Sequence, residues 1–263
     1  MPTQNKDLAL KIRQHVLQMT HDAKCSHVGS ALSCADILAV LYNSVLKIDS
    51  QNPDWDDRDR FIMSKGHACS ALYAVLAERG FFPIKDLETF YQNNGLSGHV
   101  SHDVKGVDAS TGSLGHGLPI ACGMALAGKQ KYRVFCLLSD GDLNEGSTWE
   151  AIMFAKQHKL DNLIAIIDYN QSQALGNSRD MLNLDSLSNK FRAFGWWTKN
   201  INGHDLLSIE KSLKVIPENK YSPTCIIAHT IKGYGVKWMN NRTEWHYQYP
   251  NDAELKQALD ELK

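Results

Sequence analysis

Polar side chains follow two apolar runs at positions where a metal ion could be held. The run 133–138 ends shortly before Asp140, and the run 162–167 ends shortly before Asn170. Such runs are typical of buried parallel strands, whose carboxyl ends meet at one edge of a sheet. We therefore expect Asp140 and Asn170 to offer a carboxylate and an amide oxygen to one point. Mg²⁺ takes few protein oxygens and completes its octahedron with phosphate oxygens and water, so the pair predicts a phosphorylated cofactor.

The segment 141–148 has the glycine spacing of a P-loop but lacks its chemistry. Ser147 occupies the place of the P-loop lysine, and Asp142 and Glu145 would repel a triphosphate. The sequence therefore argues against an NTPase. An acidic surface turn is the alternative for this segment taken alone.

Asp140-Gly141, followed by Asn170 thirty residues later, resembles the thiamine diphosphate motif. The resemblance implies that the Asp140 and Asn170 side chains and the Ser172 carbonyl hold Mg²⁺, or Ca²⁺ or Mn²⁺ in its place, and that the Gly141 N–H donates to the diphosphate. The family usually begins this motif with glycine, whereas this chain has Ser139. If the backbone there has a positive φ, serine introduces strain.

The apolar periodicity predicts alternating helices and strands. Strands are expected at 133–138, 162–168, 195–200 and 223–229. Helices are expected at 6–21, 33–46, 67–79, 84–92, 114–129, 145–158, 185–194, 205–216 and 252–262. This order predicts an α/β fold, a parallel sheet with helices on both faces and with ligands at the carboxyl ends of the strands.

Histidines gather in loops, several of them beside glycine. The chain has 11 histidines, and the long polar connection 95–112 contains His99 and His102. Histidines next to glycines indicate a pocket where the backbone closely approaches a polar ligand. A zinc site from His99 and His102 lacks a third ligand of suitable spacing.

Four blocks, in this order, resemble the amino-terminal half of transketolase along nearly the whole chain. They are 26–29, 59–67, 110–117 and 231–235. The fold this implies is the diphosphate-binding (PP) fold of thiamine diphosphate enzymes. The resemblance also implies that four histidines line the channel to the thiazolium ring and contact diphosphate or sugar hydroxyls, exchanging protons near neutral pH: His27, His67, His99 and His246.

The resemblance assigns further cofactor contacts. Gly112 and Leu114 would offer backbone groups to the aminopyrimidine end. Glu145 and Glu150 would lie at a dimer interface, in a network able to pass protons between active sites. The alternative for Glu150 is an exposed helical acid.

Composition limits the remaining possibilities. The chain has 263 residues, a mass of 29.5 kDa and a formal net charge of −1. It has no long run of like charge and no apolar stretch near the ~20 residues that span a bilayer, so we expect a small-molecule enzyme, with neither nucleic acid nor membrane as partner. The polar start and the six cysteines without a Cys-x-x-Cys pair predict a cytoplasmic protein with buried thiols.

The resemblance predicts that residues 1–263 form a single PP-type domain without the pyrimidine or carboxyl-terminal domain of transketolase. We therefore expect the amino-terminal subunit of a split transketolase, which is active only with a separate pyrimidine-domain subunit and pairs with it as a heterotetramer. Together they would transfer a two-carbon ketol unit from a ketose, such as a ketose phosphate, to an aldose.

Two alternatives remain at this point. The chain could be half of another thiamine diphosphate enzyme, a deoxyxylulose phosphate synthase or a 2-oxoacid decarboxylase. It could also be a non-catalytic subunit that keeps the fold for assembly. The histidine cluster favours ketol transfer over the first, and intact Asp140, Asn170 and Glu145 argue against the second.

Overall fold

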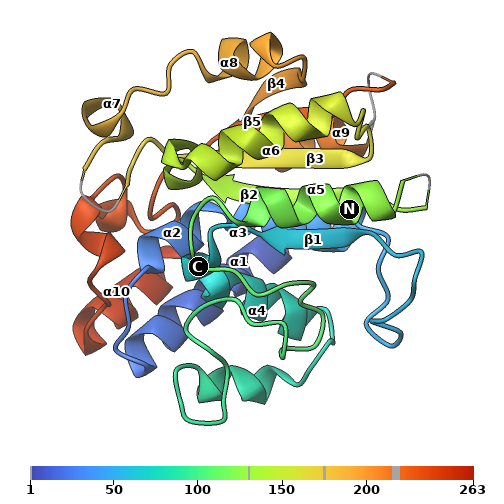
Figure 1. Ribbon diagram of the computed structural model, residues 1–263. Coiled ribbons are helices and arrows are strands. Elements are labelled where there is room, and N and C mark those ends of the chain that lie inside the picture. Colours follow the sequence, from blue (N-terminus) through green and yellow to red (C-terminus); the bar gives the residue numbers. More distant parts are fainter. Residues whose placement is uncertain (1, 130, 174–175, 215–219) are drawn as a thin grey trace.

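A five-stranded parallel sheet forms the centre of the molecule (Figure 1). The computed structural model describes residues 2–129, 131–173, 176–214 and 220–263. The strand order is β1-β2-β3-β5-β4, and every neighbouring pair is parallel. The strands are β1 (Arg60–Met63), β2 (Val134–Ser139), β3 (Leu163–Tyr169), β4 (Trp197–Asn202) and β5 (Thr224–His229).

Successive side chains of the central strands enter two different cores, as the period of two in a strand requires. Phe135 and Leu137 of β2 pack into one core. Val134, Cys136 and Leu138 pack into the other. Both faces of the sheet are therefore covered, which explains why these strands are continuous apolar runs.

Helices cover both faces (Figure 1). One face carries α5 (Gly117–Ala127), α6 (Gly146–Gln157) and α8 (Leu187–Ala193). The opposite core takes side chains from the remaining long helices and two short ones: α1 (Pro2–Asp22), α2 (Val28–Ser33), α3 (Ala35–Val40), α4 (Cys69–Glu78), α9 (Leu206–Lys214) and α10 (Asp252–Glu261). This arrangement confirms the expected α/β fold with a parallel sheet and helices on both faces.

Several element boundaries differ from the expectations. Strand β1 and helices α2 and α7 (Ser178–Met181) are not predicted from the sequence, because four to six residues are too few to show a period. The expected helix 33–46 consists of α3 followed by a π-helical turn, Leu41–Val45, and the expected helix 84–92 is the 3-10 helix Ile84–Thr89. Residues 215–216 of the expected helix 205–216 lie outside the described residues.

Two further expectations concern side chains and length. All six cysteines are free and buried, as the sequence predicts. Among the helices described here, none has both the length and the apolar character needed to cross a membrane.

The central strand should be highly sensitive to loss of side-chain volume. Ile166 of β3 is 1% exposed, and Ile166→Ala is expected to lower the free energy of unfolding by about 2–5 kcal/mol, because it leaves a cavity in a closely packed core. Chemical denaturation measures this change. Leu207→Ala is the matched control, since Leu207 on α9 is 60% exposed and its truncation should change stability by less than about 0.5 kcal/mol. Equal losses in the two variants would contradict the core assignment.

Candidate active site

The register of β2 and β3 brings Asp140 and Asn170 to the same edge of the sheet. Ser139 at the end of β2 pairs with Asp168 of β3. The next residue after Ser139 is Asp140, and Asn170 directly follows the last residue of β3. Both polar residues therefore sit where two parallel strands end, the usual position of ligands in such sheets.

A cavity of about 250 Å³ lies over this edge. Most of the predicted site residues line it. They are His27, His67, His99, His246, Gly112, Leu114, Gly141, Asn170 and Ser172, and they are joined by Ser30, Lys65, Ser139 and Gln173. Residues from distant parts of the sequence thus line one cavity, slightly smaller than the usual range of about 300–1,000 Å³ for small-molecule sites.

Asp140 has an unsatisfied acceptor. It is 2% exposed, its Oδ2 accepts a hydrogen bond from Ser178 Oγ (2.6 Å), and its Oδ1 has no partner. Burial is the main cause that raises the pKa of this carboxyl to about 7. A cation binds favourably at a buried carboxylate oxygen that has no hydrogen-bond donor, because it replaces the interaction with water that the oxygen lost on burial.

The second candidate ligand is already oriented. Asn170 Nδ2 donates to Ser33 Oγ (3.4 Å), and Asn170 Oδ1 accepts from the Ser172 N–H (3.1 Å). Among the described residues, no group of three or more histidines, cysteines or acids could hold a metal. Carboxylate, amide and carbonyl oxygens fit Mg²⁺ or Ca²⁺, and a set this small fits an ion that also takes phosphate oxygens.

Two buried lysines stand beside these residues, and the sequence patterns assign a role to neither. Lys65 donates to the Ser30 carbonyl (2.9 Å) and to Asp168, which also accepts from Ser33 and Thr230. Burial opposes the charge on Lys65, but Asp168 outweighs it and raises the pKa of Lys65 above its usual value. Lys65 is therefore a buried cation in the cavity wall.

Lys232 is the second of these lysines. It is 1% exposed, and its Nζ lies 3.1 Å from His246 Nδ1 and 3.4 Å from the Gln173 carbonyl. Burial, followed by repulsion from Lys65, lowers the pKa of Lys232 to about 8. The sequence signal for both lysines is a single cation next to a glycine, Lys65-Gly66 and Lys232-Gly233, inside blocks already singled out.

The four predicted histidines form one cluster. Ring centroids are 5.1 Å apart for His27 and His67, 5.0 Å for His27 and His246, and 6.0 Å for His27 and His99. His27 has a left-handed backbone (φ 79°), and its N–H donates to the His246 carbonyl (2.9 Å). A non-glycine residue in this region costs free energy, so the surrounding contacts must hold it there.

All four histidines are expected from the sequence to exchange protons near neutral pH, but three of them do not titrate there. Burial is the largest cause that lowers the pKa of His27 to about 4 and that of His246 to about 3, and it takes the pKa of His67 well below its usual value. Neighbouring lysines and histidines lower all three further. At pH 7 these rings are neutral, and each can donate one hydrogen bond and accept another.

The strain considered for Ser139 is absent. Its backbone is not in the positive-φ region, and its N–H and Oγ donate to Asp142 Oδ2 at 2.8 and 2.9 Å. Asp142 is fully buried and also accepts from Ser64 Oγ (2.6 Å) and the Gly115 N–H (2.9 Å). This carboxylate ties the ends of β1 and β2 to the loop before α5, a role that no sequence pattern indicates.

The structure does not place Glu145 in the cavity wall. Glu145 and Glu150 are both exposed, at the start and in the first half of α6. Gly115 packs closely against Glu145, since a Cβ added at Gly115 would lie 2.5 Å from the Cβ of Glu145. Glu145 is therefore next to the loop that carries Leu114 but faces the outside of this chain.

The parallel sheet, the oxygen ligands at its carboxyl edge and the glycine-lined cavity define a domain of the class that binds thiamine diphosphate. The family "Transketolase, thiamine diphosphate binding domain" matches residues 4–262. The chain belongs to this family, and it is of the amino-terminal type found in transketolases that are divided between two chains. The resemblance seen in the sequence is thereby confirmed.

Individual relatives agree with this assignment. The chain is 37% identical over 256 residues to an apulose-4-phosphate transketolase subunit of Phocaeicola vulgatus, covering 96% of this chain and 91% of that one. It is 40% identical to the protein of the same name from Actinobacillus succinogenes, covering 97% and 94%. The solved transketolase of Leishmania mexicana superposes with a TM-score of 0.93 at 28% identity, covering 98% of this chain and 41% of that longer one.

The neutral state of the histidines predicts how stability depends on pH. Between pH 6.5 and 4 the unfolded chain binds protons that folded His27 and His246 do not, so the free energy of unfolding should fall as the pH falls through this window. His27→Gln should make this dependence shallower in urea denaturation. His21→Gln is the control, because a hydrogen bond to the Asp22 carboxylate raises the pKa of His21, so His21 loses its stabilising effect only as the pH rises above 6.5. This variant should therefore leave the slope between pH 6.5 and 4 unchanged. An unchanged slope in His27→Gln would refute the neutral state.

Proposed function

We propose that this chain holds Mg²⁺ and the diphosphate of thiamine diphosphate at the tips of β2 and β3. With a pyrimidine-domain partner, it would transfer a two-carbon ketol unit from a ketose to an aldose. The observation that carries the proposal is the buried Asp140 Oδ1 without a partner, in a residue whose neighbours Ser139 and Gly141 line the cavity together with Asn170. Asp140, Asn170 and the Ser172 carbonyl would be the protein ligands of the ion.

The charges around the site suit an anionic cofactor. Lys65 and Lys232 are cations, and they are balanced by Asp168 and in part by Asp140, whose pKa is about 7, so the buried charges beside the cavity leave a small positive excess before anything binds. Mg²⁺ would compensate most of the diphosphate charge, and the Lys232 ammonium would contact a diphosphate oxygen. The Gly141 N–H would donate to the same group, at a glycine where an added Cβ would meet Leu114 at 2.9 Å.

The histidines would bind the sugar. When bound, thiamine diphosphate supplies the carbanion that attacks the donor carbonyl. Neutral His27, His67 and His246, together with His99, can make hydrogen bonds to sugar hydroxyls, and a neutral ring nitrogen can take up a proton from a hydroxyl. The relatives from Phocaeicola vulgatus and Actinobacillus succinogenes are named for a phosphorylated sugar, so we propose a sugar phosphate as one of the substrates.

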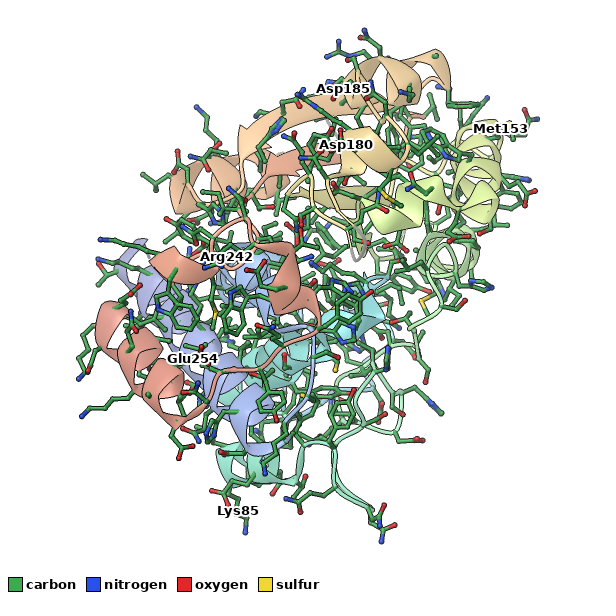
Figure 2. All side chains as sticks on the ribbon, turned by 90° about the vertical axis from the view of Figure 1, so that its left-hand side faces the viewer. Lys85, Met153, Asp180, Asp185, Arg242 and Glu254 are labelled. Atoms are coloured by element: carbon green, nitrogen blue, oxygen red, sulfur yellow. The ribbon has the colours of Figure 1, made fainter. Side chains whose placement is uncertain are left out.

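We propose that two copies of this chain meet through the outer face of α5 and α6, giving a heterotetramer with the pyrimidine-domain partner. This face exposes Leu126 (42%), Met153 (50%) and Phe154 (39%). Glu150 lies on the same helix as Met153, and Glu145 directly precedes that helix. Figure 2 shows Met153 at the outer side of the molecule. Exposed apolar side chains grouped on one face are typical of protein–protein contacts.

Removal of the acidic ligand tests the function. In the two-subunit complex, Asp140→Asn is expected to weaken Mg²⁺-dependent uptake of thiamine diphosphate by about 100-fold or more, beyond the 10–100-fold typical of residues that only support a ligand. Calorimetry measures the uptake, and turnover with a ketose phosphate should fall in parallel. Asp180→Asn, an exposed acid on α7, should leave both unchanged.

Two outcomes would contradict the proposal. Unchanged turnover in an assembled Asp140→Asn complex would mean that the ion is held elsewhere. Turnover of pyruvate in preference to a ketose phosphate by the unmodified complex would favour the decarboxylase or synthase alternative.

A charge on the outer face of α6 tests the assembly. Met153→Glu is expected to reduce the molar mass of the complex in light-scattering chromatography by about half, because two carboxylates would be buried against an apolar surface. Leu207→Glu, on the exposed side of α9, is the matched control and should not change the mass. A complex of unchanged mass in Met153→Glu would exclude this face as the contact.

A further inference from the structure

The loop that carries Lys232 is fastened at three of its residues. The Ile231 N–H donates to His204 Nε2 (2.8 Å). The Gly233 N–H donates to the Gly29 carbonyl (3.0 Å). On the far side, the Tyr234 carbonyl accepts from Arg13 Nε (3.1 Å). The residues on both sides of Lys232 are therefore tied to other elements of the fold.

His204 makes two of the contacts to this loop. Besides its bond to Ile231, its ring stacks on Tyr234 with a centroid distance of 3.5 Å and an interplanar angle of 12°. His204 comes from the connection between β4 and α9, and its side chain is 7% exposed. It thus contacts the residue directly before Lys232 and the residue two positions after it.

An ion pair on the other side fixes the ring of His204. Its Nδ1 lies 2.8 Å from Asp36 Oδ2, and Asp36 is held by Arg13 through two hydrogen bonds of 3.1 and 2.5 Å. Because Nε2 accepts from the Ile231 N–H, the proton of the neutral ring is on Nδ1 and points at the carboxylate. The ring therefore has one orientation and one tautomer.

Lys232 needs such support more than Lys65 does. Lys65 is anchored directly by Asp168. Among the described residues, no carboxylate forms an ion pair with Lys232, whose Nζ has only the long contact to Gln173 and the contact to His246. A buried ammonium without its own ion pair takes its position from its backbone.

We propose that His204 is a positioning residue for the Lys232 ammonium. Through Ile231 and Tyr234, it holds the loop so that Nζ faces the diphosphate of the cofactor. The inference rests on the proposed function, since it assumes a diphosphate in the cavity. Neither His204 nor Lys232 is among the residues that line the cavity, but Lys232 Nζ contacts His246 and Gln173, which both line it. His204 has no such contact and acts only through the loop.

Two substitutions separate the halves of the imidazole. His204→Asn can still donate to Asp36 but offers no acceptor to the Ile231 N–H, whereas His204→Gln can place an acceptor oxygen near the position of Nε2. We expect His204→Asn to raise the Kd of the two-subunit complex for Mg²⁺ and thiamine diphosphate by about tenfold, in the range found for supporting residues. We expect His204→Gln to raise it by less than about threefold, because the bond to Ile231 is kept.

A double-mutant cycle decides whether the effect passes through Lys232. In a Lys232→Met background, His204→Asn should raise the Kd by less than about twofold, because the group that it positions is gone. Calorimetry with inorganic pyrophosphate and Mg²⁺ on the full chain provides a second reading, independent of turnover. His229→Asn is the matched control, as His229 bonds to Asn200 (2.8 Å) and is expected to leave the Kd unchanged.

The outcomes are distinguishable. Thermal unfolding shows first which variants fold; if His204→Asn does not, the same cycle is run with His204→Ala, which also lacks the acceptor. The positioning role would be overturned if His204→Asn raised the Kd tenfold both with and without Lys232, or if Lys232→Met alone left the Kd unchanged. In either case the unmodified complex would still take up the cofactor. Absence of Mg²⁺-dependent uptake by the unmodified complex would overturn the proposed function and this inference with it.

Discussion

Besides Asp142, four charged side chains are buried at the carboxyl edge of the sheet, and the geometry of the site depends on how their charges are compensated. Asp168 and Lys65 form an ion pair, and Asp168 also accepts a hydrogen bond from Ser33. Asp140 and Lys232 keep unused bonding capacity next to the cavity. Buried charge is tolerated only where partners replace water, so the first pair holds the structure and the second pair is available to a ligand.

The same buried charges set the state of the histidines. After burial itself, positive charge from Lys232 and Lys65 and from neighbouring rings keeps protons off His27, His67 and His246. A cavity with two lysines and four imidazolium rings would be strongly cationic. With neutral rings it can contact uncharged hydroxyl groups near a strongly charged diphosphate site, and these two kinds of recognition are what a sugar-transferring thiamine diphosphate enzyme requires.

The sequence predicted the central strands and the meeting of Asp140 with Asn170, because long apolar runs leave little choice of structure and parallel strands end at a common edge. It did not predict β1 or α7, which are too short to show a period. It also gave no sign of the structural role of Asp142. A carboxylate in a polar segment is usually solvated. Asp142 is buried and connects several segments only because Ser64 and Gly115 come close enough to donate hydrogen bonds to it.

The sequence by itself determined the α/β class, the family and most of the residues that line the cavity, since these follow from local period and from motifs of fixed spacing. Tertiary structure alone decided which charges are paired. Lys65 pairs with Asp168, 103 positions away in the sequence, and His204 pairs with Asp36, 168 positions away. Contacts between such distant residues depend on the packing of whole elements, and so do the pKa values, because burial is a property of the folded chain and not of any segment.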